Sequence, residues 1–444
     1  MEKIISTPCG KIKGYGCRIP GVVAYKGIRY ATAGRWEYPK VVTGWDGIYD
    51  ANSYGNCSYQ PRSFYNEEEN LKKIFYYNEF RRGETYEYSE DCLFLNVWTP
   101  DDVNCHSKLP VIVYIHGGGF TGGCGHEKHF DDPIWPTKGV IAVTINYRLG
   151  PLGFFCLPEL KEEAGHTGNY GLFDQIAALQ WVKENIRSFG GDPEKITVMG
   201  QSAGAMSVQI LCQSPLSEGL FSAAVMSSGC GMTDMLMSDG EKVYSFWREF
   251  MHRLGCSTCE ELRQVDPEVL FSAWQSEKKK IKGGMVATFP IRDGVLITKE
   301  PFVRDIPYVV GSNSHDMAPP ILYLLARGWG KKKKLKSYVY MFDRMLPGDK
   351  NGAWHSSDLW YWFGTLDNCW RPFEAKDYEI SDQMTTMLCN FAKNRTPNGE
   401  NIPIWKPSLE SNKTMCIGEG ATEMKKPSQV KLLVTMLTKK SVGE

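Results

Sequence analysis

The 444-residue sequence predicts an α/β protein with a mostly parallel central sheet, helices on both faces of that sheet and a small helical lid. Residues 109–116 and 140–146 are almost entirely apolar, as expected of strands that are covered on both faces. In residues 171–188 the apolar side chains recur on one stripe at helical spacing. Residues 196–205 then have the pattern of a strand, a glycine-flanked turn and a helix start. Strands and helices therefore alternate along the chain, which is typical of a parallel sheet.

The other elements follow in chain order. Residues 1–60 contain short strands that alternate apolar and polar side chains, which favours an antiparallel sheet edge. Residues 61–88 are polar, charged and tyrosine-rich, and we expect them to form a surface excursion at the rim of a pocket. The remaining predictions are a strand over 91–98, a strand over 221–228, an amphipathic helical lid over 234–285, strands over 307–313 and 337–342, and a helix over 377–394.

Charge and composition exclude several classes of protein. The 51 basic and 51 acidic residues balance, which gives no argument for binding nucleic acid. The basic run Lys331–Lys336 is expected to be a solvated loop or helix face. No stretch reaches about 18 consecutive apolar residues, so no membrane span is expected. No repeat, low-complexity block or linker interrupts the chain, and residues 1–444 are predicted to form a single domain.

The N-terminal residues lack the apolar segment of a secretory signal, so we expect a cytoplasmic protein of bacterial type. In that compartment most of the 14 cysteines should be free thiols. Cys256 and Cys259 form a lone CxxC with no second pair at zinc spacing, and no metal is expected. We also expect no cofactor, and a monomer that acts on a small molecule.

The strongest chemical signal is the pentapeptide Gly200-Gln-Ser-Ala-Gly204. A serine at a strand-to-helix turn lies on a strained corner with its hydroxyl exposed. The helix that follows directs free N–H groups and its positive end toward any anion formed on that oxygen. Ser202 is therefore the candidate nucleophile, and an ordinary strand-to-helix turn is the alternative interpretation.

A serine hydroxyl is a weak nucleophile until a neighbouring base takes its proton, and that base is usually a histidine held by a carboxylate. After Ser202 the chain has only His252, His315 and His355. His252 lies in an amphipathic helical stretch and His315 directly precedes Asp316. His355 lies in a loop beyond the predicted strand 337–342. We predict Asp316 as the acid and His355 as the base, with His315 as the alternative base.

The glycine run Gly117–Gly119 follows a buried strand, and its N–H groups have no side chains to block a ligand. Together with the N–H of Ala203, they can bind the oxyanion of a tetrahedral intermediate. A flexible loop or a phosphate cradle is the alternative interpretation. No GK[ST] sequence follows, and the order of the glycine run and the serine turn favours the oxyanion hole.

Other polar groups are assigned structural roles. We expect His116 to orient the glycine loop through a backbone contact. The run His126–His129 resembles a metal motif but lacks the spacing of a helical HExxH pair, so a solvated loop is predicted. Glu90 and Asp91 are adjacent on a strand and face opposite ways. We expect ion pairing there, with an arginine such as Arg148, rather than catalysis.

Taken together, these motifs resemble the type-B carboxylesterases, the branch of the α/β-hydrolases that includes para-nitrobenzyl esterases, vertebrate carboxylesterases and cholinesterases. The matching segments run through nearly the whole chain: 25–31, 89–98, 116–120, 146–150, 168–175, 189–193, 200–204, 311–316 and 352–355. The resemblance implies an α/β-hydrolase fold with Ser202 as the nucleophile and His355 as the base. It also implies Gly118, Gly119 and Ala203 as the oxyanion donors.

The resemblance also draws attention to individual positions. Asp316 stands where the family usually carries glutamate, while Ser228 and Asp358 fall at positions of supporting residues. Gln201 stands where many members carry glutamate, so no negative charge adjoins the serine. Cys57 and Cys92 match the first disulfide of secreted members, and in a cytoplasmic chain they would be reduced thiols.

The spacing of the predicted acid and base indicates a shortened chain. Only 39 positions separate Asp316 from His355. The family usually has a long helical insert between the two, and that insert walls the pocket. A more open cleft is therefore expected.

The sequence thus predicts a serine carboxylic-ester hydrolase that forms an acyl-enzyme with a small-molecule ester. The charge balance and the many aromatic residues favour uncharged apolar or aryl esters. A feruloyl- or cinnamoyl-type esterase for plant-derived esters is a narrower form of this prediction. An amide hydrolase and a non-catalytic adhesion-type relative are the alternatives, and the second is disfavoured because both Ser202 and His355 are present.

Overall fold

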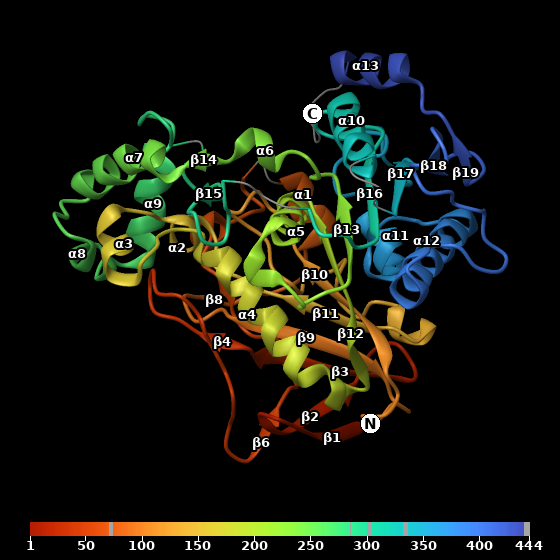
Figure 1. Cartoon of the computed structure of the whole chain (residues 1–444), viewed down its shortest axis with the longest axis horizontal. Coiled ribbons are helices and arrows are strands. Elements are labelled where there is room, and N and C mark those ends of the chain that lie inside the picture. The colour runs from red at the N-terminus through yellow and green to blue at the C-terminus, as the bar shows by residue number, and fades with distance from the viewer. Residues whose placement is uncertain (71–73, 285, 300–302, 332–335, 439–444) are drawn as a thin grey trace.

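One large mixed sheet runs through the molecule (Figure 1). The computed structural model describes residues 1–70, 74–284, 286–299, 303–331 and 336–438. In these residues the sheet has 13 strands, and β6 (Ile48–Asp50) pairs with β2 outside the main order. That main order is β1 (Glu2–Thr7), β2 (Gly10–Gly16), β3 (Val22–Arg29), β9 (Phe94–Pro100), β11 (Ile141–Ile145), β10 (Leu109–Ile115), β12 (Gly191–Gln201), β13 (Ala223–Ser227), β16 (Tyr308–Asn313), β17 (Ser337–Asp343), β18 (Thr414–Gly418) and β19 (Glu423–Lys425).

The centre of the sheet, from β11 to β18, is parallel throughout. Strands β1, β2, β3 and β9 add an antiparallel edge, and β19 closes the other side antiparallel to β18. This arrangement confirms the predicted α/β class and the antiparallel N-terminal edge. Three two-stranded sheets lie outside it: β4 (Ala31–Thr32) with β5 (Lys40–Val41), β7 (Cys57–Ser58) with β8 (Tyr88–Ser89), and β14 (Ser238–Asp239) with β15 (Ile291–Arg292).

The helices cover the sheet and its ends. The α-helices are α1 (Ile74–Phe80), α2 (Gly150–Phe154), α3 (Pro158–Ala164), α4 (Tyr170–Asn185), α5 (Ala203–Gln213), α6 (Thr233–Leu236), α7 (Gly240–Arg253), α8 (Cys259–Arg263), α9 (Pro267–Glu277), α10 (Pro319–Gly330), α11 (Leu359–Phe363), α12 (Ala375–Asn394) and α13 (Gln429–Thr438). Short 3-10 helices are η1 (Pro61–Phe64), η2 (Trp135–Lys138), η3 (Ile186–Phe189), η4 (Pro215–Ser217) and η5 (Leu366–Asn368). None of the described helices is long and apolar enough to cross a bilayer.

Strand β10 shows why the central strands are apolar along their whole length. Val111, Val113 and Ile115 pack in one core with α4 and α5. Ile112 and Tyr114 pack in a second core with α11 and α12. Because successive side chains of a strand point to opposite faces, a nearly continuous apolar run is needed to serve both cores.

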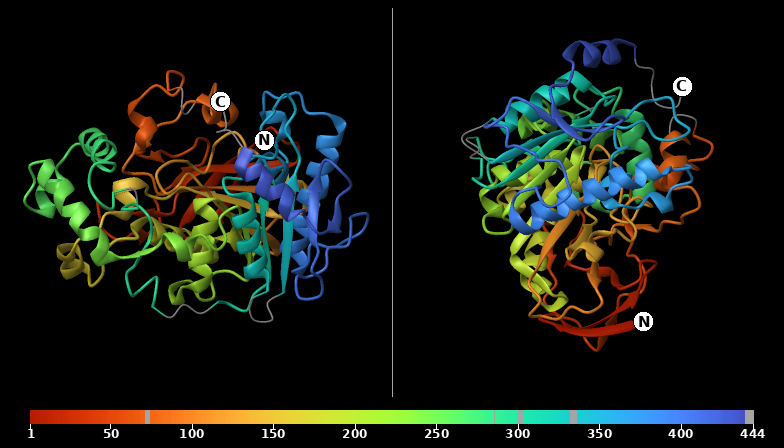
Figure 2. Two further views of the ribbon diagram at one scale, coloured as in Figure 1. Left: turned by 90° about the horizontal axis from the view of Figure 1, so that it is seen from above. Right: turned by 90° about the vertical axis from the view of Figure 1, so that its right-hand side faces the viewer.

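The predicted lid segment is helical but lies away from the cavity described below. Helices α7, α8 and α9 gather with α3 at one end of the molecule, on the left in Figure 1. They enclose a third core around Phe246, Trp247, Phe271 and Trp274. No described residue of 234–284 lines the cavity that holds Ser202. The N-terminal strands and α13 lie at opposite ends in Figure 1 and in the right-hand view of Figure 2.

The carboxyl ends of the parallel strands bring the candidate residues to one edge of the sheet. Strand β10 runs into the glycine loop, β12 into Ser202 and β13 into Ser228. Strand β16 leads to Asp316 and β17 leads to the loop that holds His355. This edge is where open parallel sheets bind ligands. Most of the basic run, residues 332–335, lies outside the described residues.

A buried ion pair ties this edge to α4. Arg148 donates from Nε and Nη2 to Asp174 at 2.8 and 2.7 Å, and both side chains are almost fully buried. Arg148 Nη1 also donates to the backbone carbonyls of Gly34 and Glu37. One side chain thus joins three separate stretches of the chain.

The prediction that Glu90 or Asp91 pairs with Arg148 was wrong. Glu90 and Asp91 do form ion pairs, but with Arg35 and Arg29, because Arg148 turns inward toward α4. These two pairs are partly exposed, and none of their residues lines the cavity.

We expect Arg148→Ala to lower the free energy of unfolding by about 3–5 kcal/mol, because it leaves the Asp174 carboxylate buried without its partner. Chemical denaturation monitored by fluorescence measures the change. Lys183→Ala is the control, because its partner Glu194 is 77% exposed, and it should cost less than about 1 kcal/mol. Equal losses for the two variants would contradict the structural role of the buried pair.

Candidate active site

Ser202 occupies the sharp turn between β12 and α5. Its backbone φ of 57° and ψ of −126° fall outside the regions that ordinary residues adopt, at an expected cost of about 1–3 kcal/mol. The surrounding backbone leaves no room for side chains. A Cβ on Gly204 would lie 2.1 Å from the carbonyl oxygen of Ile115, and one on Gly229 would lie 2.3 Å from that of Ser202. The turn points the serine side chain into a cavity, as its motif predicts.

The imidazole of His355 contacts the carboxylate of Asp316. The distance from Nδ1 to Oδ1 is 2.6 Å, and Asp316 is fully buried. The backbone N–H groups of Met317 and Asn313 donate to the same carboxylate. Burial alone would raise the pKa of Asp316, but the His355 imidazole, with the Ser228 hydroxyl and the Met317 N–H, outweighs burial and holds that pKa below its ordinary value. The group therefore stays a carboxylate that orients the ring.

The other ring nitrogen of His355 faces Gln201. The distance between His355 Nε2 and Gln201 Nε2 is 3.2 Å. Since Nδ1 donates to Asp316, Nε2 is the acceptor, and the Gln201 amide is the donor of this contact. The lone pair on His355 Nε2, which would take a proton from Ser202, thus faces the cavity. In this structure it accepts a hydrogen bond from the neutral Gln201 amide.

A second layer of polar groups lies beneath this pair. Asp358 accepts from Ser227 Oγ at 2.9 Å, from Tyr340 Oη at 3.1 Å and from Asn313 Nδ2 at 3.2 Å. Ser228 has a φ of 54°, and its hydroxyl helps to lower the pKa of Asp316. Burial raises the pKa of Asp358 above its ordinary value. These contacts fix the strand ends that carry Asp316 and His355.

The alternative base lies elsewhere. His315 Nδ1 is 3.0 Å from Ser314 Oγ, and the ring lies against Gly352. Its backbone forms an isolated bridge with Trp354, and its side chain is not among those that line the cavity. His252 lies exposed in the last turn of α7. The structure brings the carboxylate of Asp316 to the imidazole of His355.

The glycine loop lies on the other side of Ser202. Gly117, Gly118 and Gly119 all line the cavity. Ala203 opens α5, where first-turn N–H groups have no partner within the helix. The predicted contact of His116 is confirmed, because Nδ1 lies 2.8 Å from the carbonyl oxygen of Gly117. Burial lowers the pKa of His116, so the ring stays neutral.

The sequence analysis did not identify Gln60, which forms two hydrogen bonds with the glycine loop. Gln60 Oε1 accepts from the N–H of Gly123 at 2.9 Å, and Gln60 Nε2 donates to the carbonyl of Gly123 at 3.2 Å. The two residues are 63 positions apart, so no local pattern could reveal the pair. Gln60 thus fastens the glycine loop to the wall of the cavity.

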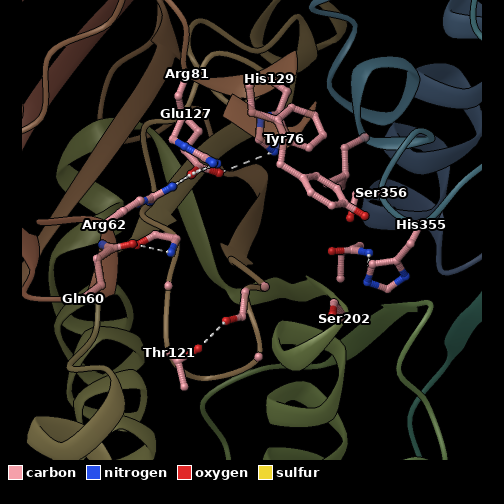
Figure 3. A pocket seen from close by; sticks show the side chains of 18 of the residues that line it. Gln60, Arg62, Tyr76, Arg81, Thr121, Glu127, His129, Ser202, His355 and Ser356 are labelled. Atoms are coloured by element: carbon pink, nitrogen blue, oxygen red, sulfur yellow. Dashed lines mark hydrogen bonds and ion pairs between the residues drawn. The ribbon is translucent and has the colours of Figure 1, made fainter. Parts of the chain in front are cut away.

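The cavity has a volume of about 460 Å³ (Figure 3). The predicted excursion over 61–88 supplies one wall, which confirms its expected place at a pocket. Tyr65, Tyr76, Phe80 and Phe130 contribute aromatic surface. Figure 3 shows Arg62, Arg81 and Glu127 together across the cavity from His355, and Glu67 is the fourth charged lining residue.

These charges form a buried network. Glu127 accepts from Arg62 Nη1 at 2.7 Å and from Arg81 Nη1 at 3.3 Å, and Arg81 also pairs with Glu67. Burial would raise the pKa of Glu127, but the two arginines outweigh it and hold the value at about 2. The prediction of a solvated loop over 126–129 was therefore wrong. The loop folds inward because Glu127 meets two cations and because His129 packs between Phe80 and Phe130.

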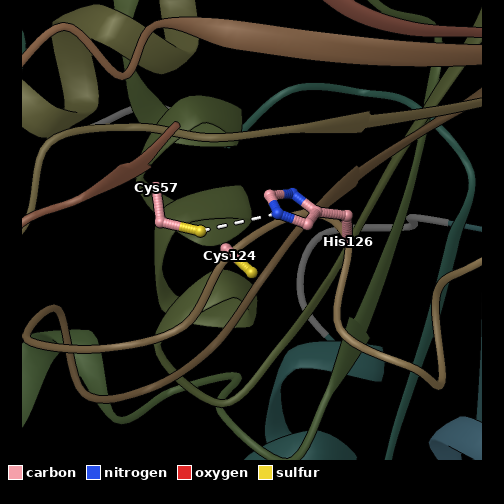
Figure 4. A group of neighbouring side chains, drawn as sticks. All are labelled: Cys57, Cys124 and His126. Carbon is pink, nitrogen blue, oxygen red and sulfur yellow. Dashed lines mark hydrogen bonds between the residues drawn. The ribbon is translucent and has the colours of Figure 1, made fainter. Parts of the chain in front are cut away.

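The cysteines expected to match a disulfide are both free and buried. Cys57 lies instead beside Cys124 and His126 (Figure 4). Among the described residues, these three form the one group of histidine, cysteine or acidic side chains whose ligand atoms lie close enough together to hold a metal ion. The sequence analysis set the loop aside because His126 and His129 lack the spacing of a helical HExxH pair, and Cys57 lies 69 positions before His126.

Comparison with known proteins identifies the family. A model described as the carboxylesterase family matches residues 1–337 and 320–433. The chain belongs to the carboxylesterase family. It is 30% identical over 474 residues to the para-nitrobenzyl esterase of Bacillus subtilis strain 168, covering 90% of this chain and 92% of that protein. The family membership confirms the resemblance and makes this chain a carboxylic-ester hydrolase of the type-B group.

Solved structures agree with this assignment. A PNB esterase structure aligns with a TM-score of 0.82 at 27% identity, over 98% of this chain and 99% of that one. An esterase from anaerobic Clostridium hathewayi, described as able to hydrolyse aliphatic aromatic polyesters, aligns with a TM-score of 0.83 at 25% identity, over 99% and 98% of the two chains. The α/β-hydrolase fold is thereby confirmed.

We expect Asp316→Asn to lower kcat by about 10⁴-fold, because an amide cannot hold the imidazole in the tautomer with a free Nε2. Initial rates with a p-nitrophenyl ester measure it. His315→Gln is the matched variant on the adjacent residue, and it should keep kcat within about tenfold. A large loss for His315→Gln together with a small one for Asp316→Asn would reassign the acid and the base.

Proposed function

We propose that this carboxylesterase is a serine hydrolase that forms an acyl-enzyme on Ser202. The observation that carries the proposal is the 2.6 Å contact of His355 with Asp316 at the cavity into which the strained Ser202 turn projects.

In the first half of the proposed reaction, His355 Nε2 accepts the proton of the Ser202 hydroxyl as its oxygen attacks the ester carbonyl. The imidazolium that results is stabilised by Asp316, and Gln201 releases Nε2 for this transfer. His355 then gives the proton to the departing alcohol. In the second half, water loses a proton to His355 and attacks the acyl-enzyme, which frees the acid and restores Ser202.

The oxyanion of each tetrahedral intermediate would be held by the N–H groups of Gly118, Gly119 and Ala203. A donor of this kind typically contributes about 2.7–4 kcal/mol to the stability of the transition state. The contacts of Gln60 with Gly123 support this role, because they tie the glycine loop to a second segment of the cavity wall.

The cavity supports aryl or aliphatic esters near the serine. The aromatic side chains of Tyr76 and Phe80 lie on the wall supplied by residues 60–67 and 76–81, and their rings can pack against an apolar acyl or alcohol group. Cinnamate-type esters fit the same description, and so do the aromatic polyesters named for the Clostridium hathewayi enzyme. Uncharged esters therefore remain the class that we propose for the portion of the substrate beside Ser202.

The far wall supports a polar group at the other end of the substrate. The side chain of Arg62 is 7% exposed and lines the cavity. Its Nη1 bonds to Glu127, but Nε and Nη2 have no hydrogen-bond partner among the described residues. Leaving such donors unpaired in a closed site costs about 1–3 kcal/mol. Both atoms are buried in this structure, so we propose that the Arg62 side chain turns toward the cavity and that these donors then receive a hydrogen-bond acceptor, such as a carboxylate or a carbonyl, from the substrate.

We expect Ser202→Ala to lower kcat by about 10⁶-fold on p-nitrophenyl butyrate, because the nucleophile is gone. A serine-reactive organophosphate should label Ser202 in the wild type and should fail to label this variant, as peptide mass spectrometry can establish. Full activity in Ser202→Ala would end the proposal. A matched anilide, turned over as fast as the ester, would favour an amide hydrolase instead.

We expect Arg62→Ala to lower kcat/KM at least about tenfold for an aryl ester whose acyl chain ends in a carboxylate, and to leave p-nitrophenyl butyrate nearly unchanged. Arg82→Ala is the control: Arg82 follows Arg81 in the sequence but is exposed, and its loss should affect neither substrate. Equal losses on both esters would show that Arg62 supports the fold of the wall and does not select the substrate.

A further inference from the structure

We propose that Cys57, Cys124 and His126 bind one zinc ion behind the glycine loop. The ligand atoms of the three side chains all lie within 4.8 Å of one another. Figure 4 shows the two sulfur atoms and the imidazole nitrogen turned toward a common space. All three residues are buried, with Cys57 and Cys124 fully inaccessible.

The spacing fits the coordination distances of zinc. Zn–S bonds of about 2.3 Å and Zn–N bonds of about 2.0–2.1 Å at tetrahedral angles place a sulfur and a nitrogen ligand about 3.6 Å apart. The distance from Cys57 Sγ to His126 Nε2 is 3.6 Å. Thiolate and imidazole donors select zinc and similar soft ions over magnesium or calcium. The chemistry of the donor set therefore defines the class of metal.

The surroundings hold the imidazole in place for a ligand role. The ring of Tyr54 stacks on His126 with centroids 4.4 Å apart and an interplanar angle of 9°. The ring of Tyr86 lies 5.6 Å away on a tilted plane. The hydroxyl of Tyr86 is buried and has no hydrogen-bond partner in the described ranges. A water on the fourth position of the zinc ion would supply such a partner.

The proposed ion would join two segments that build the cavity. Cys57 belongs to β7 and lies three residues before Gln60, whereas Cys124 follows Gly123 in the glycine loop. The Gln60 and Gly123 hydrogen bonds already connect the same two segments. Zinc would add a strong bond to each segment and would fix the loop that carries Gly118 and Gly119. Binding would release the two thiol protons to solvent.

The test uses the full chain purified without a polyhistidine tag. We expect elemental analysis to find about one zinc per chain, and cobalt substitution to give a sulfur-to-cobalt charge-transfer band. Cys57→Ser, Cys124→Ser and His126→Gln should each lower the metal content about tenfold or more. Cys92→Ser is the matched control, because Cys92 is also buried and free, and it should retain the metal.

Two results on metal binding and on the thiols would overturn the zinc site, and a third result, on stability, is described below. One is a wild-type chain that binds neither zinc nor cobalt after reduction and dialysis against the metal. The other is a native Cys57–Cys124 disulfide, which thiol titration of the denatured chain would reveal as two thiols fewer than the 14 of the sequence. Because variants can fail to fold, the wild type is also melted with and without zinc. Specific binding should raise its melting temperature, and an unchanged value would contradict the proposal.

Discussion

The sharp turn at Ser202 is the constraint on which the rest of the structure depends. The backbone there adopts a φ of 57°, which an ordinary residue avoids. It is kept in that state because β12 and α5 are both buried and their neighbours leave no alternative path. The parallel strands on either side then determine which residues can meet the serine. Their carboxyl ends all open on the same edge of the sheet, and the acid, the base and the glycine loop come from those ends.

The cavity beside this turn has one side built from backbone and an opposite side built from polar side chains. We call them the rigid side and the polar side. The rigid side consists of backbone: the glycine loop, the start of α5 and the ends of β12 and β13. The polar side consists of long side chains from residues 60–67 and 76–81 and from the loop at 126–129. Its ion pairs are buried, and an unpaired charge there would be expensive. The two sides meet at the Gln60–Gly123 pair and at the cluster of Cys57, Cys124 and His126.

The central strands of the sheet could be predicted from the sequence, because burial on both faces requires nearly continuous apolar runs in β10, β11 and β12. The sequence was also sufficient to suggest that Asp316 and His355 meet, since strand ends converge in a parallel sheet. It did not reveal α10, because Pro319 and Pro320 suggest a break, although proline is favoured in the first turn of a helix. It placed His126–His129 in solvent, because their burial depends on Arg62 and Arg81, which lie far away along the chain.

The close packing of the backbone around Ser202 bears on how this protein can change its substrate range. Neither Gly204 nor Gly229 has room for even one methyl group beside the serine turn. Changes of substrate range are therefore easier to accommodate at the opposite wall, where aromatic side chains such as Tyr65 and Tyr76 line the cavity, provided that the buried ion pairs of Arg62 and Arg81 are kept. Combinatorial libraries aimed at new esters should concentrate on that wall and leave the serine turn untouched.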